Sequence, residues 1–78
     1  MKKGERIARV GTQPGRITWV AWDRQRRAVR EVLCWWDEPA APWDGHGERH
    51  YARLLLETGA VLEVCHEQDR WLVCGVED

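Results

Sequence analysis

Short segments in which apolar and polar residues alternate at every second position recur along this sequence. A period of two is typical of β-strands with one buried face, and these segments are rich in the β-branched and aromatic residues that strands favour. Residues that favour turns separate the segments. The pattern therefore predicts strands at 16–22, 26–36, 48–57, 60–66 and 70–76.

The second segment has a competing interpretation. Residues 28–33 could also form a helix, but the run continues into Trp35 and Trp36, which favours one long, bent strand. The two rings must then point to opposite faces of that strand.

Turn lengths predict how the last three strands pair. Thr58-Gly59 suits a two-residue hairpin turn, which would place Leu55 beside Leu62 and Tyr51 beside His66. After the turn at Gln68-Asp69, an odd number of loop residues would put residues 62, 64 and 66 on one face with residues 72, 74 and 76. This register places Cys65 and Cys74 on opposite faces, which argues against a disulfide between them.

The first fifteen residues differ from the rest. Ile7 and Val10 are their only large apolar residues, and three Gly and one Pro punctuate them. We expect residues 1–15 to form an N-terminal arm, either without regular structure or with a short edge strand around 7–10. Residues 16–78 are expected to form a single all-β domain.

Several segments carry apolar residues at both odd and even positions. A flat sheet with one buried face would alternate more cleanly. We therefore expect a small all-β antiparallel meander of four or five strands, curled or closed halfway into a barrel.

Composition and charge narrow the functional classes. The 78 residues include six Trp but no Ser, so a serine nucleophile is excluded. Residues 1–30 contain nine Lys or Arg against two acids, whereas residues 31–78 contain three Arg against eleven acids. The basic part could attract phosphates or acidic surfaces, or the two parts could neutralise each other across the sheet. There is no apolar run near 18 residues and no secretory signal, so we expect a cytoplasmic protein without membrane contact.

Tryptophan and arginine residues are interleaved in the basic part and just beyond it. Aromatic rings that stack bases and arginines that follow phosphates are the usual equipment for binding single-stranded nucleic acid. The competing interpretation is that Trp fills the core of a protein that has no Phe. The candidate residues for binding nucleic acid or a partner are Trp19, Trp22, Arg24, Arg26, Arg27, Trp36 and Trp43.

Metal binding and catalysis have weaker signals. His46 and His50 have a spacing that metal sites use, but Cys65 and His66 are neighbours that would point apart on a strand, and no Cys-x-x-Cys pair occurs. No arrangement marks Cys34 as a nucleophile beside His50 or His66. We expect no metal, no cofactor and no enzymatic activity, with the three Cys acting as reduced apolar residues.

An ordered series of short motifs runs through residues 16–78. It comprises Ile17-Thr18-Trp19, Val29-Arg30-Glu31-Val32-Leu33 with Trp35, Trp43, Arg49-His50-Tyr51, Leu62-Glu63-Val64, Trp71-Leu72 and Val76-Glu77-Asp78. This series resembles a family of short bacterial proteins of unknown function, which are similar to the C-terminal region of ImuB-like Y-family translesion polymerase proteins. The resemblance implies a setting in DNA damage tolerance and supplies no catalytic residues.

These observations lead to two hypotheses. In the first, the chain is a non-catalytic accessory module that contacts a Y-family polymerase-like protein, single-stranded DNA, or both. In the second, it is a protein-interaction module without nucleic-acid contact, which docks a partner on a sheet edge or an exposed Trp patch.

Overall fold

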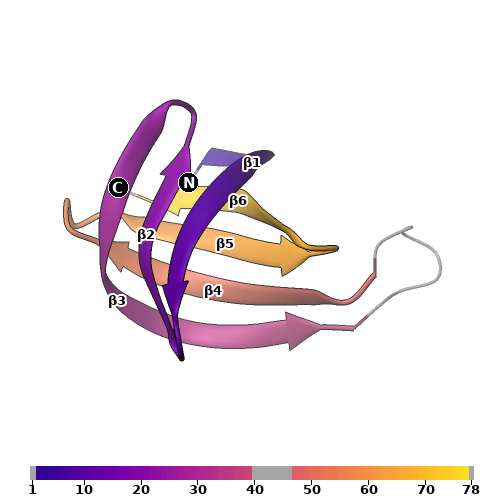
Figure 1. The fold of residues 1–78 in the computed structure, drawn as a ribbon. Coiled ribbons are helices and arrows are strands. Elements are labelled where there is room, and N and C mark those ends of the chain that lie inside the picture. Colours follow the sequence, from indigo (N-terminus) through magenta and orange to yellow (C-terminus); the bar gives the residue numbers. More distant parts are fainter. Residues whose placement is uncertain (1, 40–46, 78) are drawn as a thin grey trace.

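A computed structural model describes residues 2–39 and 47–77, with side chains from residue 5 onward. The described chain is all-β and antiparallel, as the alternating pattern predicted (Figure 1). Its six strands are β1 (Lys2–Gln13), β2 (Arg16–Trp22), β3 (Gln25–Glu38), β4 (Arg49–Leu56), β5 (Val61–Glu67) and β6 (Arg70–Glu77). The five expected strands are thus present, with bounds that shift by at most two residues.

The sixth strand, β1, is the main departure from the expected architecture. Residues 1–15 were predicted to be an arm, either without regular structure or with a short edge strand around 7–10. The strand is present but longer, because Lys2–Gln13 pairs with β6 through its first half and with β2 through its second half. Ala8 and Val10 face the core and alternate with the outward-facing Ile7 and Arg9. The small Ala8 weakened the alternation in the sequence, and Gly11 resembles a strand breaker although it lies inside the strand.

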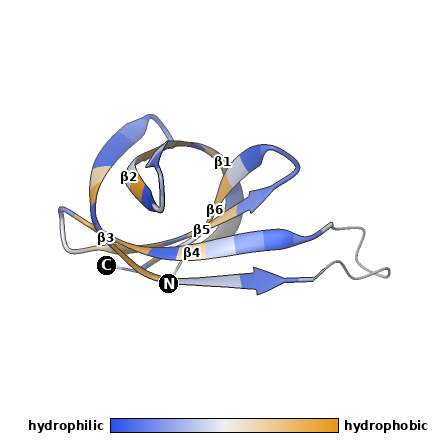
Figure 2. Cartoon of the chain, turned by 60° about the horizontal axis from the view of Figure 1, so that its bottom comes forward, coloured by the Kyte–Doolittle hydropathy of each residue, from blue (hydrophilic) through white to orange (hydrophobic). Residues whose placement is uncertain are grey.

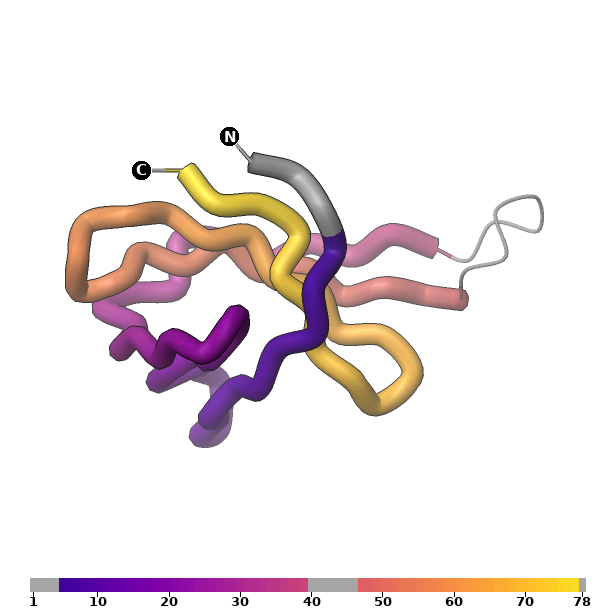
Figure 3. Tube along the Cα trace, turned by 90° about the horizontal axis from the view of Figure 1, so that it is seen from above, coloured from indigo at the N-terminus to yellow at the C-terminus, as the bar shows by residue number. Residues whose placement is uncertain are grey.

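Pairing of β1 with β6 closes the sheet into a barrel in the order β1-β2-β3-β4-β5-β6. The predicted meander, curled or closed halfway into a barrel, agrees with this curvature but lacked the strand that completes the closure. Two strands bend enough to take part in two sheets. Residues 25–28 of β3 pair with β2 and residues 29–38 pair with β4, while β1 divides its partners in the same way. The short sheet β1-β2-β3 therefore lies across the longer one, which consists of β4, β5, β6 and the adjoining halves of β1 and β3 (Figure 3).

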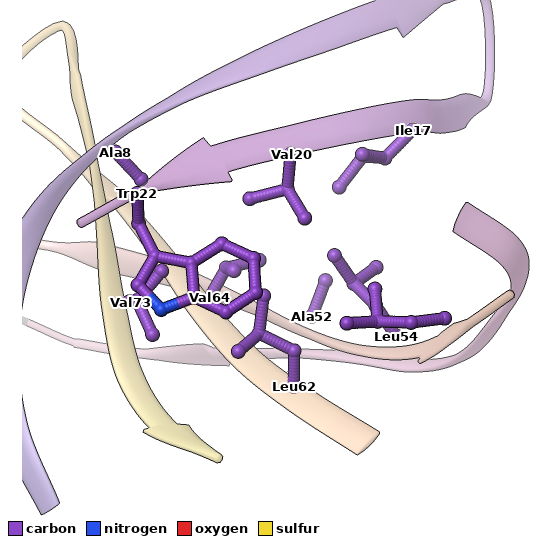
Figure 4. Close-up of a cluster of buried hydrophobic side chains, with 10 residues drawn as sticks. Ala8, Ile17, Val20, Trp22, Ala52, Leu54, Leu62, Val64 and Val73 are labelled. Atoms are coloured by element: carbon purple, nitrogen blue, oxygen red, sulfur yellow. The ribbon is translucent and has the colours of Figure 1, made fainter. Parts of the chain in front are cut away.

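The barrel interior holds one hydrophobic cluster. Leu54, Leu62, Val20 and Val64 are fully buried there, and Trp22 lies among them with 6% of its surface exposed (Figure 4). The hydrophilic ends of β3 and β4 lead away from this core (Figure 2). A second, smaller cluster of Tyr51, Cys65 and Leu72 lies on the opposite face of the longer sheet, which explains why both parities are apolar.

The β4–β5 hairpin has a longer turn than predicted. Leu54 pairs with Leu62 and Tyr51 with Cys65, one residue away from the expected register. The amide of Gly59 donates to the Leu56 carbonyl at 3.0 Å, and Gly59 has a φ of 92°. The loop is therefore a turn followed by a left-handed glycine, and its extra residue shifts every pair by one.

The β5–β6 register also differs from the prediction. Gln68 and Asp69 have φ values of 48° and 61° and form a tight two-residue turn that pairs Cys65 with Leu72. An irregularity opposite Glu63 and Val64 leaves Cys74 as an extra residue, after which Leu62 pairs with Val76 as expected. Because of this bulge, Cys65 and Cys74 lie in the same cluster, and the prediction of opposite faces is wrong.

Candidate nucleic-acid interface

The outer face of the β1-β2-β3 sheet carries two neighbouring rows of cross-strand residues. In one row Trp19 on β2 pairs with Gly11 on β1 and with Ala28 on β3. In the next row Ala21 pairs with Arg9 on β1 and Arg26 on β3. From β1 to β3, the first row has a large side chain between two small residues, and the second row has a small side chain between two large ones. The surface is consequently hollow over Ala21 and bounded by the side chains around it.

Trp19 is held in place from both neighbouring strands. A Cβ on Gly11 would come within 1.8 Å of the Trp19 Nε1 atom, so the indole occupies the space above the glycine. On the β3 side, the guanidinium carbon of Arg26 lies 4.1 Å from the centre of the Trp19 ring. This is a cation–π contact, and it arranges a flat cationic group and a flat aromatic group in one stack.

A pocket of about 610 Å³ lies over this hollow. Its wall includes Arg24, which follows Asp23 in the tight β2–β3 turn, where both residues have positive φ. The described residues that line the pocket are Ile7, Ala8, Arg9, Trp19, Ala21, Trp22, Arg24, Gln25 and Arg26. They include three arginines and no acid.

The charge of this pocket is not neutralised by the acidic part of the chain. Asp23 is the nearest acid in the turn, and it forms an ion pair with Arg6. No salt bridge between described residues involves Arg9, Arg24 or Arg26. The lining therefore presents three positive charges around an apolar floor of Ala21 and the edge of Trp22.

The structure brings together four of the predicted binding residues at this pocket, namely Trp19, Arg24, Arg26 and the edge of Trp22. Trp22 was predicted to stack bases on the surface. It is instead a core residue, because it points into the barrel interior on the same face of β2 as the buried Val20. Arg27 pairs with the buried Val20 and therefore lies on the opposite face of β3 from Arg26. Its Nη1 donates a hydrogen bond to the Arg26 carbonyl at 2.9 Å.

The remaining predicted residues lie elsewhere. Trp36 stacks on Tyr51 with ring centres 5.2 Å apart and an angle of 6° between the planes, on the outer face of the longer sheet. Trp43 lies outside the described residues. The sequence reasoning missed Ile7 and Arg9, because it treated their segment as an arm. Their alternation with Ala8 and Val10 was the signal that could have identified them.

A compact ion cluster lies on the outer face of the longer sheet. Glu67 is buried and accepts two hydrogen bonds from Arg49, at 2.6 Å from Nε and 3.1 Å from Nη2. Arg49 also forms an ion pair with Glu5 at 2.9 Å, and Arg70 with Glu67 at 3.1 Å. The Arg49 guanidinium holds the pKa of Glu67 below its usual value. This cluster joins β1, β4, β5 and β6, and its charges are satisfied internally.

The described His and Cys residues make separate contacts on the surface and in the small cluster. The His50 Nδ1 atom lies 2.7 Å from Asp37 Oδ1, a contact that raises the pKa of His50. His66 stacks on Trp71, with ring centres 4.6 Å apart. Among residues 2–39 and 47–77, no group of three or more His, Cys, Asp or Glu side chains could hold a metal ion. His46 lies outside the described residues.

The part of the chain that the structure describes contains no helix long and apolar enough to cross a membrane. Comparisons with protein-family models, with curated proteins and with solved structures found no match for this chain. The resemblance to the translesion polymerase region stays a prediction.

Proposed function

We propose that this chain is a non-catalytic module that binds single-stranded nucleic acid in the pocket over Ala21. The observation that carries the proposal is the placement of Trp19 beside three arginines that have no acidic partners among the described residues. Arginine forks bind phosphate oxygens in pairs, and stacked guanidinium and indole groups bind bases.

The geometry suggests a division of roles within the pocket. Arg9 and Arg26 lie on either side of the small Ala21, so a phosphate above Ala21 could be reached from both strands. Arg24 approaches the same space from the turn. The exposed Ile7 and the Trp19–Arg26 stack offer flat or apolar surfaces to a base. Trp19 would thus bind bases together with Arg26, rather than alone.

The biological setting of this binding rests on the sequence resemblance. A module of this kind in DNA damage tolerance would contact the single-stranded DNA beside a Y-family polymerase-like partner in the cytoplasm. The main competing function is protein binding without nucleic acid. It is favoured by Trp35 and Leu33, which are 53% and 43% exposed on β3, far from the pocket.

Titration of a fluorescent single-stranded oligonucleotide, followed by anisotropy at several salt concentrations, tests the proposal. Binding should weaken steeply with salt, and replacing both Arg9 and Arg24 with Ala should reduce the slope of log K against log salt by about 1.4, at about 0.7 for each lost phosphate contact. Ala21→Leu, which fills the hollow, should abolish binding without removing a charge.

Arg16→Ala is the matched control, because Arg16 is an exposed arginine at the far end of the same sheet and does not line the pocket. Absence of binding at low salt would disprove the proposal. An Arg16 variant that loses as much affinity as the Arg9/Arg24 variant would show that general charge, and not this pocket, binds the oligonucleotide. Capture of a protein partner that persists after nuclease treatment, with no oligonucleotide binding, would support the competing function.

A further inference from the structure

The second half of β3 has a free edge. Residues 29–38 pair with β4 on one side, and no other described strand pairs with them on the other side, because β2 leaves β3 after Ala28. Backbone N–H and C=O groups along such an edge can pair with another strand. In Figure 1 this edge borders the outside of the barrel, along the part of β3 that runs beside β4.

Exposed apolar residues gather on this edge. Of the three large hydrophobic residues that are exposed in the described chain, Leu33 and Trp35 lie here, and the third, Ile7, lines the pocket. Cys34 between them is exposed as well. An isolated exposed Leu is ordinary, but two large apolar residues and a thiol on an unpaired strand edge mark a surface that another strand could cover.

A bulge in β3 determines which pairing would be consistent. Val32 and Trp35 both face the same side of the sheet as the buried Leu54 and Ala52, because Leu33 is an extra residue between them. A second copy of β3, running antiparallel, can therefore pair Val32 with the partner's Trp35 and keep both on one face. Glu31 and Trp36 share the opposite face and pair in the same register.

Charge supports this register. The same alignment brings Arg30, the extra residue of a second bulge between Val29 and Glu31, close to Asp37 of the second copy, and two-fold symmetry repeats the pair. Within its own chain, Asp37 Oδ1 contacts His50 Nδ1 at 2.7 Å. The side chains of Arg30 and Asp37 are both exposed. Arg30 uses one of its five donors on the Glu57 carbonyl at 3.0 Å, so others are available. Arg30 lies near one end of this edge and Asp37 near the other, and opposite charges placed in this way favour antiparallel pairing of the edge with itself.

We infer that the chain forms a two-fold dimer by pairing the 29–38 edges of two copies, so that β3 of one copy continues the sheet of the other. Leu33 and Cys34 lie at the two-fold axis. The two Cys34 residues are offset by one position on adjacent strands, which places their Cα atoms about 6 Å apart, within reach of a disulfide. The inference does not depend on nucleic-acid binding, since the pocket lies on the other half of β3.

Two charge variants and their mixture test the dimer by sedimentation. Arg30→Asp places Asp opposite Asp37 at both ends of the interface, and Asp37→Arg places Arg opposite Arg30. Each variant alone should dimerise at least about tenfold more weakly than the original chain, because like charges meet. Mixed in equal amounts, the two variants regain both opposite-charge pairs and should dimerise with the original affinity. Recovery in the mixture also shows that both variants are folded.

Cys34 supplies an independent measurement of the register. Mild oxidation with oxidised glutathione should join two chains through Cys34, with two electrons passing to glutathione disulfide and two glutathione thiols released. Cys34→Ser should remove this product, and reducing buffer should reverse the cross-link in the original chain. A chain that remains monomeric at high concentration would overturn the inference. Dimerisation that the single charge variants do not weaken, or that their mixture does not restore, would also overturn it.

Discussion

The indole ring of Trp19 lies over Gly11, its direct partner on the neighbouring strand, and fills the space that any side chain at position 11 would need. Glycine is thus required at position 11 by a neighbouring ring and not by a turn. The ring in turn is covered by Arg26, so three strands contribute to the position of one aromatic group. The pocket over Ala21 depends on this arrangement, because Trp19 forms one of its walls.

Gly11→Ala should therefore displace Trp19. The added methyl would overlap the pyrrole part of the indole, and overpacking of this kind typically costs about 1–3 kcal/mol. We expect a lower midpoint in urea, a change in Trp fluorescence and weaker oligonucleotide binding. Gly47→Ala is the control, since a Cβ there meets no atom within 4 Å. If Gly11→Ala left both fluorescence and stability at the original values, the close packing of Trp19 on Gly11 would be wrong.

Acid should destabilise the barrel through Glu67. The hydrogen bonds from Arg49 lower the pKa of Glu67 in the folded state from the ordinary 4.5. A lowered folded pKa contributes stability that is fully present above the unfolded pKa and is lost as the pH falls through the folded value. The free energy of unfolding should therefore drop from about pH 5 downward.

Glu67→Gln should remove that part of the pH dependence. It leaves Arg49 with Glu5 and Tyr51 as partners, so the loss at neutral pH should be near the low end for a broken buried pair, about 3 kcal/mol. Urea unfolding at several pH values measures both effects. The exposed Glu77, changed to Gln, should leave the curve unaltered. A Glu67→Gln protein with the original acid sensitivity would contradict this role.

The three thiols should differ widely in reactivity. Cys34 is exposed, whereas burial raises the pKa of Cys65 and raises that of Cys74 to about 12. Because the thiolate is the reactive form, Cys34 should react with a disulfide reagent first. The partly buried Cys74 should react more slowly, and the buried Cys65 should react last. Mass spectrometry of peptides during the reaction measures the order at low protein concentration. Early modification of Cys65 or Cys74 would show that the second cluster is open to solvent.

The strands were predictable from the sequence because a period of two survives wherever large residues alternate with polar ones. Around Ala8 the sequence predicted at most a short edge strand at 7–10, because the core-facing side chains of this segment are small. Closure of the barrel follows from that strand alone, so without it the sequence predicted only a curled sheet. Trp22 was misplaced because the pattern shows which residues share a face and not which face is interior.

The register of the strand pairs was harder to predict from the sequence than the positions of the strands. Thr58-Gly59 permits both a two-residue and a three-residue turn, and only the hydrogen bond of Gly59 distinguishes them. The bulge at Cys74 leaves no mark in the sequence, since Cys fits a paired and an unpaired position equally well. The sequence identified Arg24 and Arg26 on one side of the pocket. Arg9 on the other side could not be identified, because its position depends on the pairing of β1 with β2, which places Arg9 beside Ala21.

Pairing of β1 with β6 has a consequence for how this chain reaches its native state. Half of the first strand pairs with residues 71–76, so these residues must leave the ribosome before the barrel can close. Contacts that span the whole chain in this way slow folding, since a long loop must close before they form. Until then the apolar side chains that β1 will cover stay in water, and the time spent in that open state sets how much help from chaperones the nascent chain needs.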